Sequence, residues 1–264
     1  MINDEIDTPI GRQIFRENGV TLCVGISELY SPRLVPLFAQ AGADYVFIDM
    51  EHSSFSMREV AGIIDGAHGA RVPIVVRPPA VERGYLGRLL DLGADGIFAP
   101  RISSAADAGT AVRFMKYPPV GERGDSGKIF GTRPRSAQAA KAANENTVLV
   151  ALVETREGAE NIDEICETSG VDAISIGHAD LSLSLGVPGD RESRTYQEAE
   201  ERIVDSCRRH NMPFTIGVAP TIEQALQQKE RGCFSLFVDD EIGLITSALS
   251  SYVQEFRRQA TEHG

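Results

Sequence analysis

Short apolar runs recur along the chain and alternate with segments in which apolar residues are spaced three or four positions apart. The wider spacing is typical of helices that bury one face, and the continuous runs are typical of buried strands. Eight such runs lie within residues 21–26, 42–49, 72–76, 93–100, 147–153, 170–177, 213–218 and 232–239. Because such strands occur in parallel sheets that are covered by helices, the pattern predicts a parallel α/β fold.

Four of the eight segments share a local sequence that begins with glycine and leads into a strand: GADYVFID, GADGIFAP, GVDAISIG and GCFSLFVD. Each follows an amphipathic helical stretch, and glycine is preferred where a helix ends before a short connection. Eight strand–helix units predict a (β/α)8 TIM barrel, and the 264 residues are close to the usual length of about 250. A doubly wound sheet is the competing fold, but no GxGxxG motif follows any of the strands.

Two segments fall outside the repeat. Residues 117–146 are long for a connection between a strand and its helix, and such loops are usually lids, interface elements or disordered. Residues 241–262 predict an extended C-terminal helix with one broad apolar face. That face packs either on its own barrel or on a neighbouring subunit, and we expect the neighbour. Residues 1–264 are otherwise expected to form a single barrel domain.

Composition restricts the possible partners and the cellular location. The net charge of −12 repels phosphate backbones and anionic lipids, which argues against nucleic acid and membrane surfaces as partners. No apolar run approaches the ~20 residues of a membrane span, and the acidic N-terminus lacks the apolar core of a signal peptide, so we expect a cytoplasmic protein. The four cysteines are far apart and lack CxxC spacing, which predicts buried reduced thiols.

Polar side chains stand at or just after the ends of several predicted strands. The C-terminal strand ends of a parallel barrel converge on one mouth, where active sites lie. We therefore expect these side chains to face one pocket although they are far apart in the sequence. Carboxylates, a guanidinium and an imidazole in one pocket are a catalytic composition. The residues are Asp49, Glu51, His52, Arg77, Glu154 and Asp180.

Glu154 and Asp180 are the candidate metal ligands. Carboxylate oxygens suit hard divalent ions, and the same ligands serve Mg²⁺, Mn²⁺ and Co²⁺. A substrate with adjacent keto and carboxylate oxygens would chelate such an ion, and its enolate would be stabilised. The alternative for Asp180 is that it only caps the turn that follows it.

The remaining candidates would act on the bound substrate. Arg77 would hold an oxyanion, although it could also pair with a barrel glutamate as a purely structural residue. His52 follows Asp49 by three residues, and an Asp–His pair orients the imidazole as an acid or base; the alternative is a loop histidine bound to backbone. A helical turn offers free N–H groups to a substrate carboxylate at Gly177, His178, Ala179 and Asp180.

Other mechanisms are disfavoured by what the chain lacks. None of its four lysines lies in an apolar strand, so an aldolase that forms a Schiff base on lysine is not expected. The ends of the last two predicted strands are acidic rather than glycine-rich, which argues against the usual phosphate site of these barrels.

Six motifs in order resemble the HpcH/HpaI family of class II aldolases between about residues 21 and 243. They are FIDMEHSSF, VVRPP, LLDLGADGIFAPR, YPPVGERG, LVETREGAENIDEI and IGHADLSLSLG. The resemblance implies a metal-dependent lyase that cleaves a 4-hydroxy-2-oxo acid to pyruvate and an aldehyde. It implies Glu154 and Asp180 for the metal, Arg77 for the enolate oxygen, and His52 with Asp49 for acid–base work. Members are typically homohexamers, trimers of dimers that exchange C-terminal helices.

The chain departs from this family at three expected pocket positions. Leu152 stands where the family often has glutamine, His178 where it often has proline, and Gly25 about where a tryptophan is common. Two alternatives remain open: a citrate-lyase-like enzyme acting on CoA thioesters, and a catalytically silent barrel that serves as a binding subunit. The absence of a basic, nucleotide-sized patch disfavours the first, and the complete polar set disfavours the second.

Overall fold

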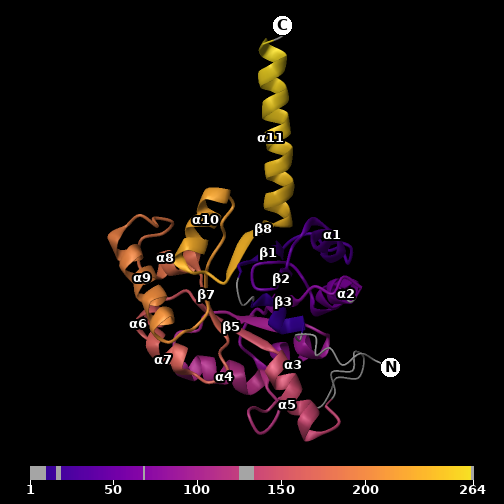
Figure 1. Cartoon of the computed structure of the whole chain (residues 1–264), viewed down its shortest axis with the longest axis vertical. Helices are drawn as coiled ribbons and strands as arrows, with labels where there is room; N and C mark the ends of the chain where they lie inside the picture. Colours follow the sequence, from indigo (N-terminus) through magenta and orange to yellow (C-terminus); the bar gives the residue numbers. More distant parts are fainter. Residues whose placement is uncertain (1–9, 16–18, 68, 125–133, 263–264) are drawn as a thin grey trace.

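Eight parallel strands form a nearly closed barrel with helices around it (Figure 1), which confirms the predicted (β/α)8 fold. This computed structural model describes residues 10–15, 19–67, 69–124 and 134–262. The strand order is β7-β6-β5-β4-β3-β2-β1-β8, and every neighbouring pair is parallel. The strands are β1 (Thr21–Ile26), β2 (Tyr45–Asp49), β3 (Ile74–Arg77), β4 (Gly96–Ala99), β5 (Val148–Val153), β6 (Ala173–Ile176), β7 (Phe214–Ile216) and β8 (Ser235–Asp240).

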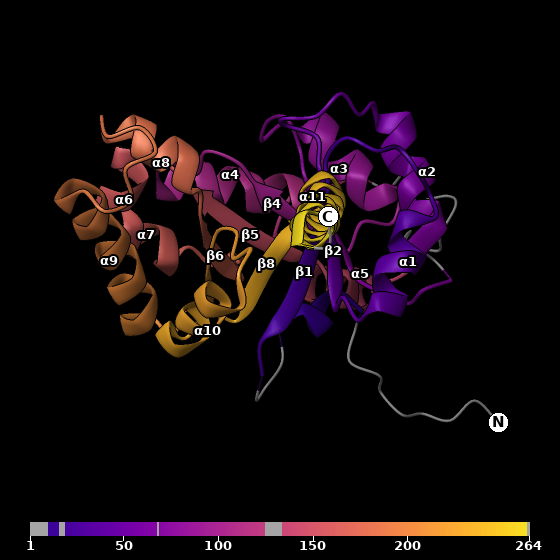
Figure 2. The same cartoon turned by 90° about the horizontal axis from the view of Figure 1, so that it is seen from above.

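The helices lie outside the strands, as the view from above shows (Figure 2). A short 3-10 helix, η1 (Ile10–Ile14), precedes β1. The α-helices are α1 (Leu34–Ala41), α2 (Met57–Ala67), α3 (Arg83–Asp91), α4 (Ala105–Met115), α5 (Ala137–Asn146), α6 (Arg156–Glu160), α7 (Ile162–Glu167), α8 (His178–Ser184), α9 (Arg194–Arg209), α10 (Ile222–Arg231) and α11 (Glu241–Glu262).

The barrel closes between β7 and β8 through a few hydrogen bonds rather than a full ladder. The Phe234 amide donates to the Phe214 carbonyl at 3.0 Å, and the Ala219 amide donates to the Phe237 carbonyl at 2.8 Å. An isolated parallel bridge also pairs Val218, which follows β7, with Phe237 of β8. These contacts bring the ends of β7 and β8 to the same mouth as the other strands.

Apolar side chains fill the space on both sides of the strands. The larger buried cluster joins strand and helix side chains, and a smaller one gathers inward-facing residues such as Tyr45, Phe98 and Val150. All four cysteines are buried and free, which confirms the predicted thiols. No helix among the described residues is long and apolar enough to cross a membrane.

Glycine marks the end of the helical segment before β2, β4, β6 and β8, as the repeat predicts. Gly42, Gly93, Gly170 and Gly232 have φ angles of 101°, 104°, 98° and 96°. A Cβ atom is strained in this left-handed region, whereas glycine enters it freely. The repeated glycine therefore allows the backbone to leave each of these helices and enter the next strand.

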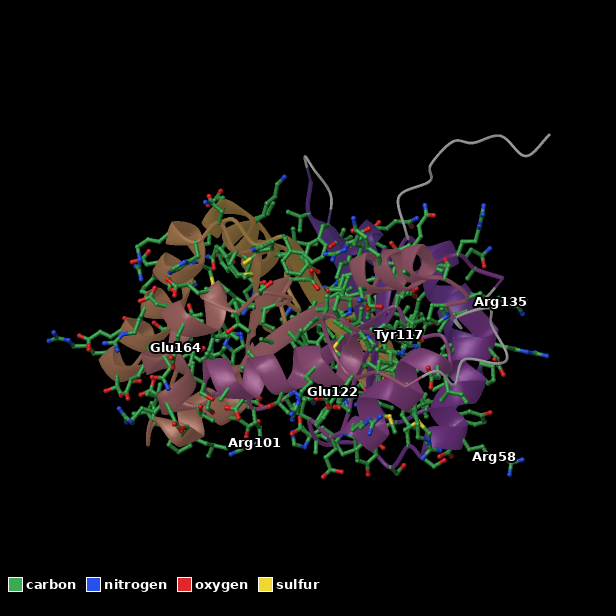
Figure 3. All side chains as sticks on the ribbon, turned by 90° about the horizontal axis from the view of Figure 1, so that it is seen from below. Arg58, Arg101, Tyr117, Glu122, Arg135 and Glu164 are labelled. Atoms are coloured by element: carbon green, nitrogen blue, oxygen red, sulfur yellow. The ribbon has the colours of Figure 1, made fainter. Side chains whose placement is uncertain are left out.

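The long segment at residues 117–146 is not the strand-to-helix connection that we expected. It follows α4, whose N-terminus is capped by the Ser104 hydroxyl, and it leads into β5. It therefore reaches the N-terminal end of β5, opposite the mouth, and its second part is helix α5. Tyr117 and Asn144 exchange two hydrogen bonds there, and the Lys116 ammonium donates to the Asn144 carbonyl. Figure 3 labels Tyr117 among the side chains, seen from below. Residues 125–133 lie outside the described residues.

Helix α11 has the predicted bounds, and its apolar face is not covered by its own barrel. Figure 1 shows the helix rising alone from β8, away from the other elements. Leu249 and Tyr252 are 62% and 73% exposed, and Ile245 and Phe256 are also exposed. Most of this face therefore has no contact with its own barrel, although Leu244 near the start of the helix packs against the core.

Candidate active site

The C-terminal strand ends surround one cavity of about 520 Å³. Eight of the nine candidate residues from the sequence line it, although they come from different strands and connections, and Glu51 is the one that does not. These eight residues therefore surround one cavity, and their contacts bear on the role of each. They are Asp49, His52, Arg77, Glu154, Gly177, His178, Ala179 and Asp180.

Arg77 is fixed by a two-pronged ion pair with Asp49. The two residues are register partners on β3 and β2, which places their side chains next to each other. Arg77 donates from Nε to Asp49 Oδ1 at 2.9 Å and from Nη2 to Oδ2 at 2.6 Å, and its Nη1 lies 3.3 Å from Glu51 Oε2. Burial opposes ionisation of Asp49, but the bonds from Arg77 hold the pKa of this carboxyl below its ordinary value. The guanidinium thus keeps a set orientation in the cavity wall.

Asp49 also shapes the turn that carries His52, but it does not contact the imidazole. Its Oδ1 accepts the backbone N–H groups of Glu51 and His52 at 2.9 and 3.4 Å. The Ser53 hydroxyl donates to the Asp49 carbonyl at 2.6 Å. The predicted Asp–His side-chain pair is therefore absent here, because the cross-strand arginine occupies both carboxylate oxygens.

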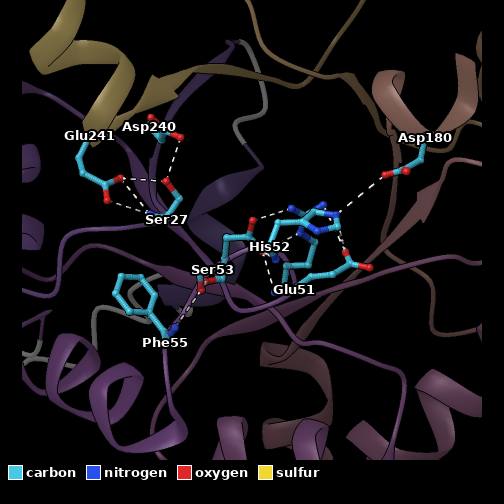
Figure 4. Close-up of polar contacts among 10 residues, drawn as sticks. Ser27, Glu51, His52, Ser53, Phe55, Asp180, Asp240 and Glu241 are labelled. Atoms are coloured by element: carbon cyan, nitrogen blue, oxygen red, sulfur yellow. Dashed lines mark hydrogen bonds and ion pairs between the residues drawn. The ribbon is translucent and has the colours of Figure 1, made fainter. Parts of the chain in front are cut away.

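His52 stands at the open side of the cavity between two carboxylates. Its Nε2 lies 3.9 Å from Glu51 Oε2 and 4.0 Å from Asp180 Oδ2 (Figure 4). The His52 side chain is 59% exposed, so both water and a ligand in the cavity reach it. Glu51 is one of the two carboxylates beside His52, and the sequence placed it in the pocket without indicating a role for it. Burial raises the pKa of Glu51 above its ordinary value, and Arg77 opposes this effect.

Glu154 carries a buried oxygen that has no hydrogen-bond partner. The residue is only 1% exposed, and its Oε1 accepts the Arg101 amide at 2.8 Å, whereas Oε2 has no donor. Burial raises the pKa of Glu154 to about 7, and the nearby carboxylates of Glu51 and Asp180 add to the effect. A buried carboxylate oxygen without a partner is costly unless a proton or a cation satisfies it.

This arrangement fits a divalent cation shared by Glu154 and Asp180. Asp180 lies in the first turn of α8 and has no hydrogen bond that would make it a cap. A Cβ atom on Gly177 would lie 2.7 Å from Glu154 Oε2, so glycine keeps this space open. Within the described ranges no group of three or more His, Cys, Asp or Glu side chains forms a complete metal cluster. Two carboxylates would therefore leave positions for water and substrate, as Mg²⁺ sites do.

Comparison with known protein families identifies the family of the chain. The sequence model of the HpcH/HpaI aldolase/citrate lyase family matches residues 27–235, most of the chain. The chain belongs to this family. This confirms the resemblance that the six motifs indicated.

Individual relatives of the HpcH/HpaI protein cover most of its length. A 4-hydroxy-4-methyl-2-oxoglutarate aldolase of Chaetomium globosum is 34% identical over 207 residues, 74% of each chain. A 5-keto-4-deoxy-D-glucarate aldolase of Enterobacter sp. is 30% identical over 236 residues, which cover 88% of this chain and 91% of that one. An HpcH/HpaI aldolase structure from Desulfitobacterium hafniense matches with a TM-score of 0.84 at 30% identity, over 90% of this chain and 93% of that one. With aldolases as relatives over this length, the chain is a carbon–carbon lyase.

His178 is a departure from the expected family pattern. It lines the cavity, and hydrogen-bonding residues behind the cavity wall hold its ring in place. Its Nδ1 lies within hydrogen-bond distance of the Tyr196 hydroxyl, which donates to Glu200 at 2.9 Å. Burial lowers the pKa of His178 to about 4, so the ring is neutral. The ring packs on the Cα of Gly217, where a side chain would collide with it. Tyr196 and Glu200 were missed because polar residues spaced by four on α9 look like a solvated helix face.

The other two departures lie next to apolar groups of the cavity. Leu152 lines it together with Phe47 and Phe98, whose rings meet edge to face at 5.2 Å. Phe237 fills the space over Gly25, because a Cβ atom there would lie 2.7 Å from the end of the phenyl ring. In this HpcH/HpaI protein, apolar groups therefore form much of the cavity wall below the polar residues.

Proposed function

We propose that this protein is a metal-dependent class II aldolase that cleaves a 4-hydroxy-2-oxo acid to pyruvate and an aldehyde. The observation that carries the proposal is the buried, unpartnered oxygen of Glu154 beside Asp180, in the cavity that also holds Arg77. The curated relatives support it, because their names describe aldolases of oxo acids.

Glu154 and Asp180 would hold a Mg²⁺, Mn²⁺ or Co²⁺ ion, which when bound polarises the keto group and offsets the negative charge that develops on it. Arg77 holds the oxygen that becomes the enolate oxygen, in the orientation that Asp49 gives to the guanidinium. The first-turn amides of α8 lack partners within the helix, and we place the substrate carboxylate against His178 and Ala179. The Gly177 amide, which the sequence also offered, is not free, because it donates to the Val153 carbonyl at 3.1 Å.

His52 is the group that we assign to the proton of the C4 hydroxyl. In the cleavage direction it takes this proton through a water molecule, the C3–C4 bond breaks, and the aldehyde leaves as the pyruvate enolate forms. Its exposed position suits a group that must exchange protons with solvent after each turnover. Glu51 and Asp180 flank the imidazole, with carboxylate oxygens 3.9 and 4.0 Å from its Nε2.

The proposal can be tested without knowing the identity of the aldehyde. With a divalent metal in D₂O, the protein is expected to exchange the methyl protons of pyruvate for deuterium, as followed by proton NMR. This exchange requires reversible enolate formation at the keto-acid end alone. A silent binding subunit would give no exchange, and a lyase specific for CoA thioesters would leave pyruvate untouched while acting on a thioester. Either result would refute the proposal.

Arg77→Lys is expected to lower kcat at least ~10²-fold, the scale for losing an oxyanion donor. The charge is kept, but an ammonium cannot bind both oxygens of Asp49 and still present a fixed donor to the substrate. The rate of oxaloacetate decarboxylation measures this effect at the keto-acid end, with the exposed Arg58→Lys on α2 as the matched control. A near-normal kcat in Arg77→Lys would show that Arg77 is only structural.

We further propose that α11 packs on a second copy of the chain, within a homohexamer built as a trimer of dimers. Its uncovered apolar face supports this, since large exposed apolar surfaces mark interaction sites. Leu249→Glu combined with Tyr252→Glu is expected to reduce the oligomer mass, measured by size-exclusion chromatography with light scattering. Gln254→Glu, on another side of the helix, should leave the mass unchanged. An unaltered mass in the double variant would contradict the proposal.

A further inference from the structure

One wall of the cavity is not used by the proposed keto-acid machinery. Arg77 is the last residue of β3, Glu154 and Asp180 follow β5 and β6, and His52 follows β2. The opposite wall comes from the ends of β7, β8 and β1 and from the residues directly after them. We call it the acceptor wall, and it consists of Gly25, Ser27, Val218, Phe237 and Asp240. In the proposed reaction, this wall is the surface left for the aldehyde half of a substrate that is held at its keto-acid end.

The acceptor wall carries negative charge. Asp240 accepts the Ser27 hydroxyl at 2.9 Å and the Gly243 amide at 2.8 Å (Figure 4). Directly behind it, the buried Glu241 accepts the backbone amides of Glu28 and Leu29 at 2.6 and 2.7 Å. Both carboxylates are held by uncharged donors, so their charge is not neutralised by an ion pair at the wall.

Among the described residues, the cavity has no further cation that could receive a second carboxylate. Among the described residues that line it, Arg77 is the one lysine or arginine, and it is already paired with Asp49 and Glu51. The Ser27 hydroxyl hydrogen is committed to Asp240. An anionic group that left water for this wall would therefore lose its hydration and meet like charge.

The wall does offer apolar surface to a substrate. Phe237 meets the Phe47 ring edge to face at 5.5 Å, so the wall continues into the aromatic floor of the cavity. Val218 is 40% exposed and forms the apolar rim above it. An aliphatic group of a few carbons that left water for Phe237 and Val218 would gain hydrophobic stabilisation without an unsatisfied polar atom.

We propose that the aldehyde partner is uncharged and carries an apolar substituent, and that aldehydes bearing a second carboxylate are poor substrates. The inference rests on the proposed function and specifies the other half of the reaction. It sets this chain apart from the relatives named for oxoglutarate and glucarate, which are dicarboxylates.

The experiment compares two aldehydes of equal chain length in aldol addition to pyruvate at saturating Mn²⁺. Butanal ends in a methyl group and 4-oxobutanoate ends in a carboxylate. We expect kcat/KM for butanal to exceed that for 4-oxobutanoate by at least ~10-fold, the scale for a group that is mismatched with its pocket. Equal or inverted rates would overturn the inference and leave the aldolase function standing. Absence of deuterium exchange in pyruvate would instead overturn the proposed function itself.

A charge placed on the wall gives a second, independent readout. Val218→Lys is expected to shift the ratio of the two kcat/KM values toward 4-oxobutanoate by at least ~10-fold, because it supplies the missing cation. Ile222→Lys, at an exposed position on α10 outside the cavity, should leave the ratio unchanged. If Val218→Lys does not move the ratio, the acceptor wall does not contact the aldehyde and the inference fails.

Discussion

Removal of divalent metal is expected to abolish both pyruvate exchange and aldol cleavage, and Glu154→Gln is expected not to recover when metal is returned. The amide keeps the shape of the side chain and its bond from the Arg101 amide, but it removes the negative charge that a cation would need. Titration with Mn²⁺, followed by calorimetry, measures the loss of affinity, and Asp180→Asn should weaken binding as well. Glu157→Gln, exposed on α6, is the control. Full turnover in EDTA would contradict the metal assignment.

Metal affinity should also decrease as pH falls, because Glu154 becomes protonated. Its pKa is raised to about 7, so below that pH a cation must displace a proton and binds more weakly. The raised pKa of Glu154 also affects the stability of the metal-free protein. A carboxyl whose folded-state pKa exceeds its unfolded value stabilises the fold at low pH and loses this contribution as pH rises toward 7. Thermal unfolding in EDTA should therefore show wild type losing stability over this range relative to Glu154→Gln.

His52→Ala is expected to separate two half-reactions. Aldol cleavage should fall by ~10² to 10⁴, the usual worth of a general base, because no group then takes the C4 hydroxyl proton. Oxaloacetate decarboxylation has no such hydroxyl and should retain most of its rate. Both rates are measured at one saturating metal concentration. Equal loss of both activities would show that His52 serves the metal or the enolate instead.

Asp49→Asn provides the contrast for that experiment. The sequence spacing suggested that Asp49 orients the imidazole, in which case this variant would share the asymmetry of His52→Ala. Its contacts with Arg77 lead to a different expectation, namely that both reactions decline together. Selective loss of aldol cleavage in Asp49→Asn would show that the link to His52 dominates after all.

The convergence of the site residues was predictable because it depends only on where strands end. The runs before Asp49, Arg77 and Glu154 are continuously apolar, and in a parallel barrel such strands all deliver their last residues to one mouth. The glycine before every second strand was informative for a similar local reason, since the left-handed φ of Gly42 and its counterparts is a property of one residue. Features of this kind depend on only a few neighbouring residues and can therefore be predicted from the sequence.

Partners that depend on register or on backbone groups were not predictable. Asp49 meets Arg77 because the two are aligned across β2 and β3, and sequence spacing alone favoured the nearer His52. The donor to Glu154 is the amide of Arg101, a group that every residue except proline carries, so residue type gives no signal. The segment at residues 117–146 was misplaced because its sequence does not show at which end of the barrel a connection lies.

The incomplete ladder between β7 and β8 has a consequence for how this enzyme can change over evolution. Arg77 and Glu154 follow strands that are hydrogen-bonded to a neighbour on each side, whereas Val218 and Phe237 lie at the loosely joined seam. Backbone amides at the seam should exchange with solvent sooner than those of β3 to β5. Substitutions there disturb few shared bonds, so a lineage can acquire a new aldehyde preference at the seam while the half of the barrel that generates the enolate stays intact.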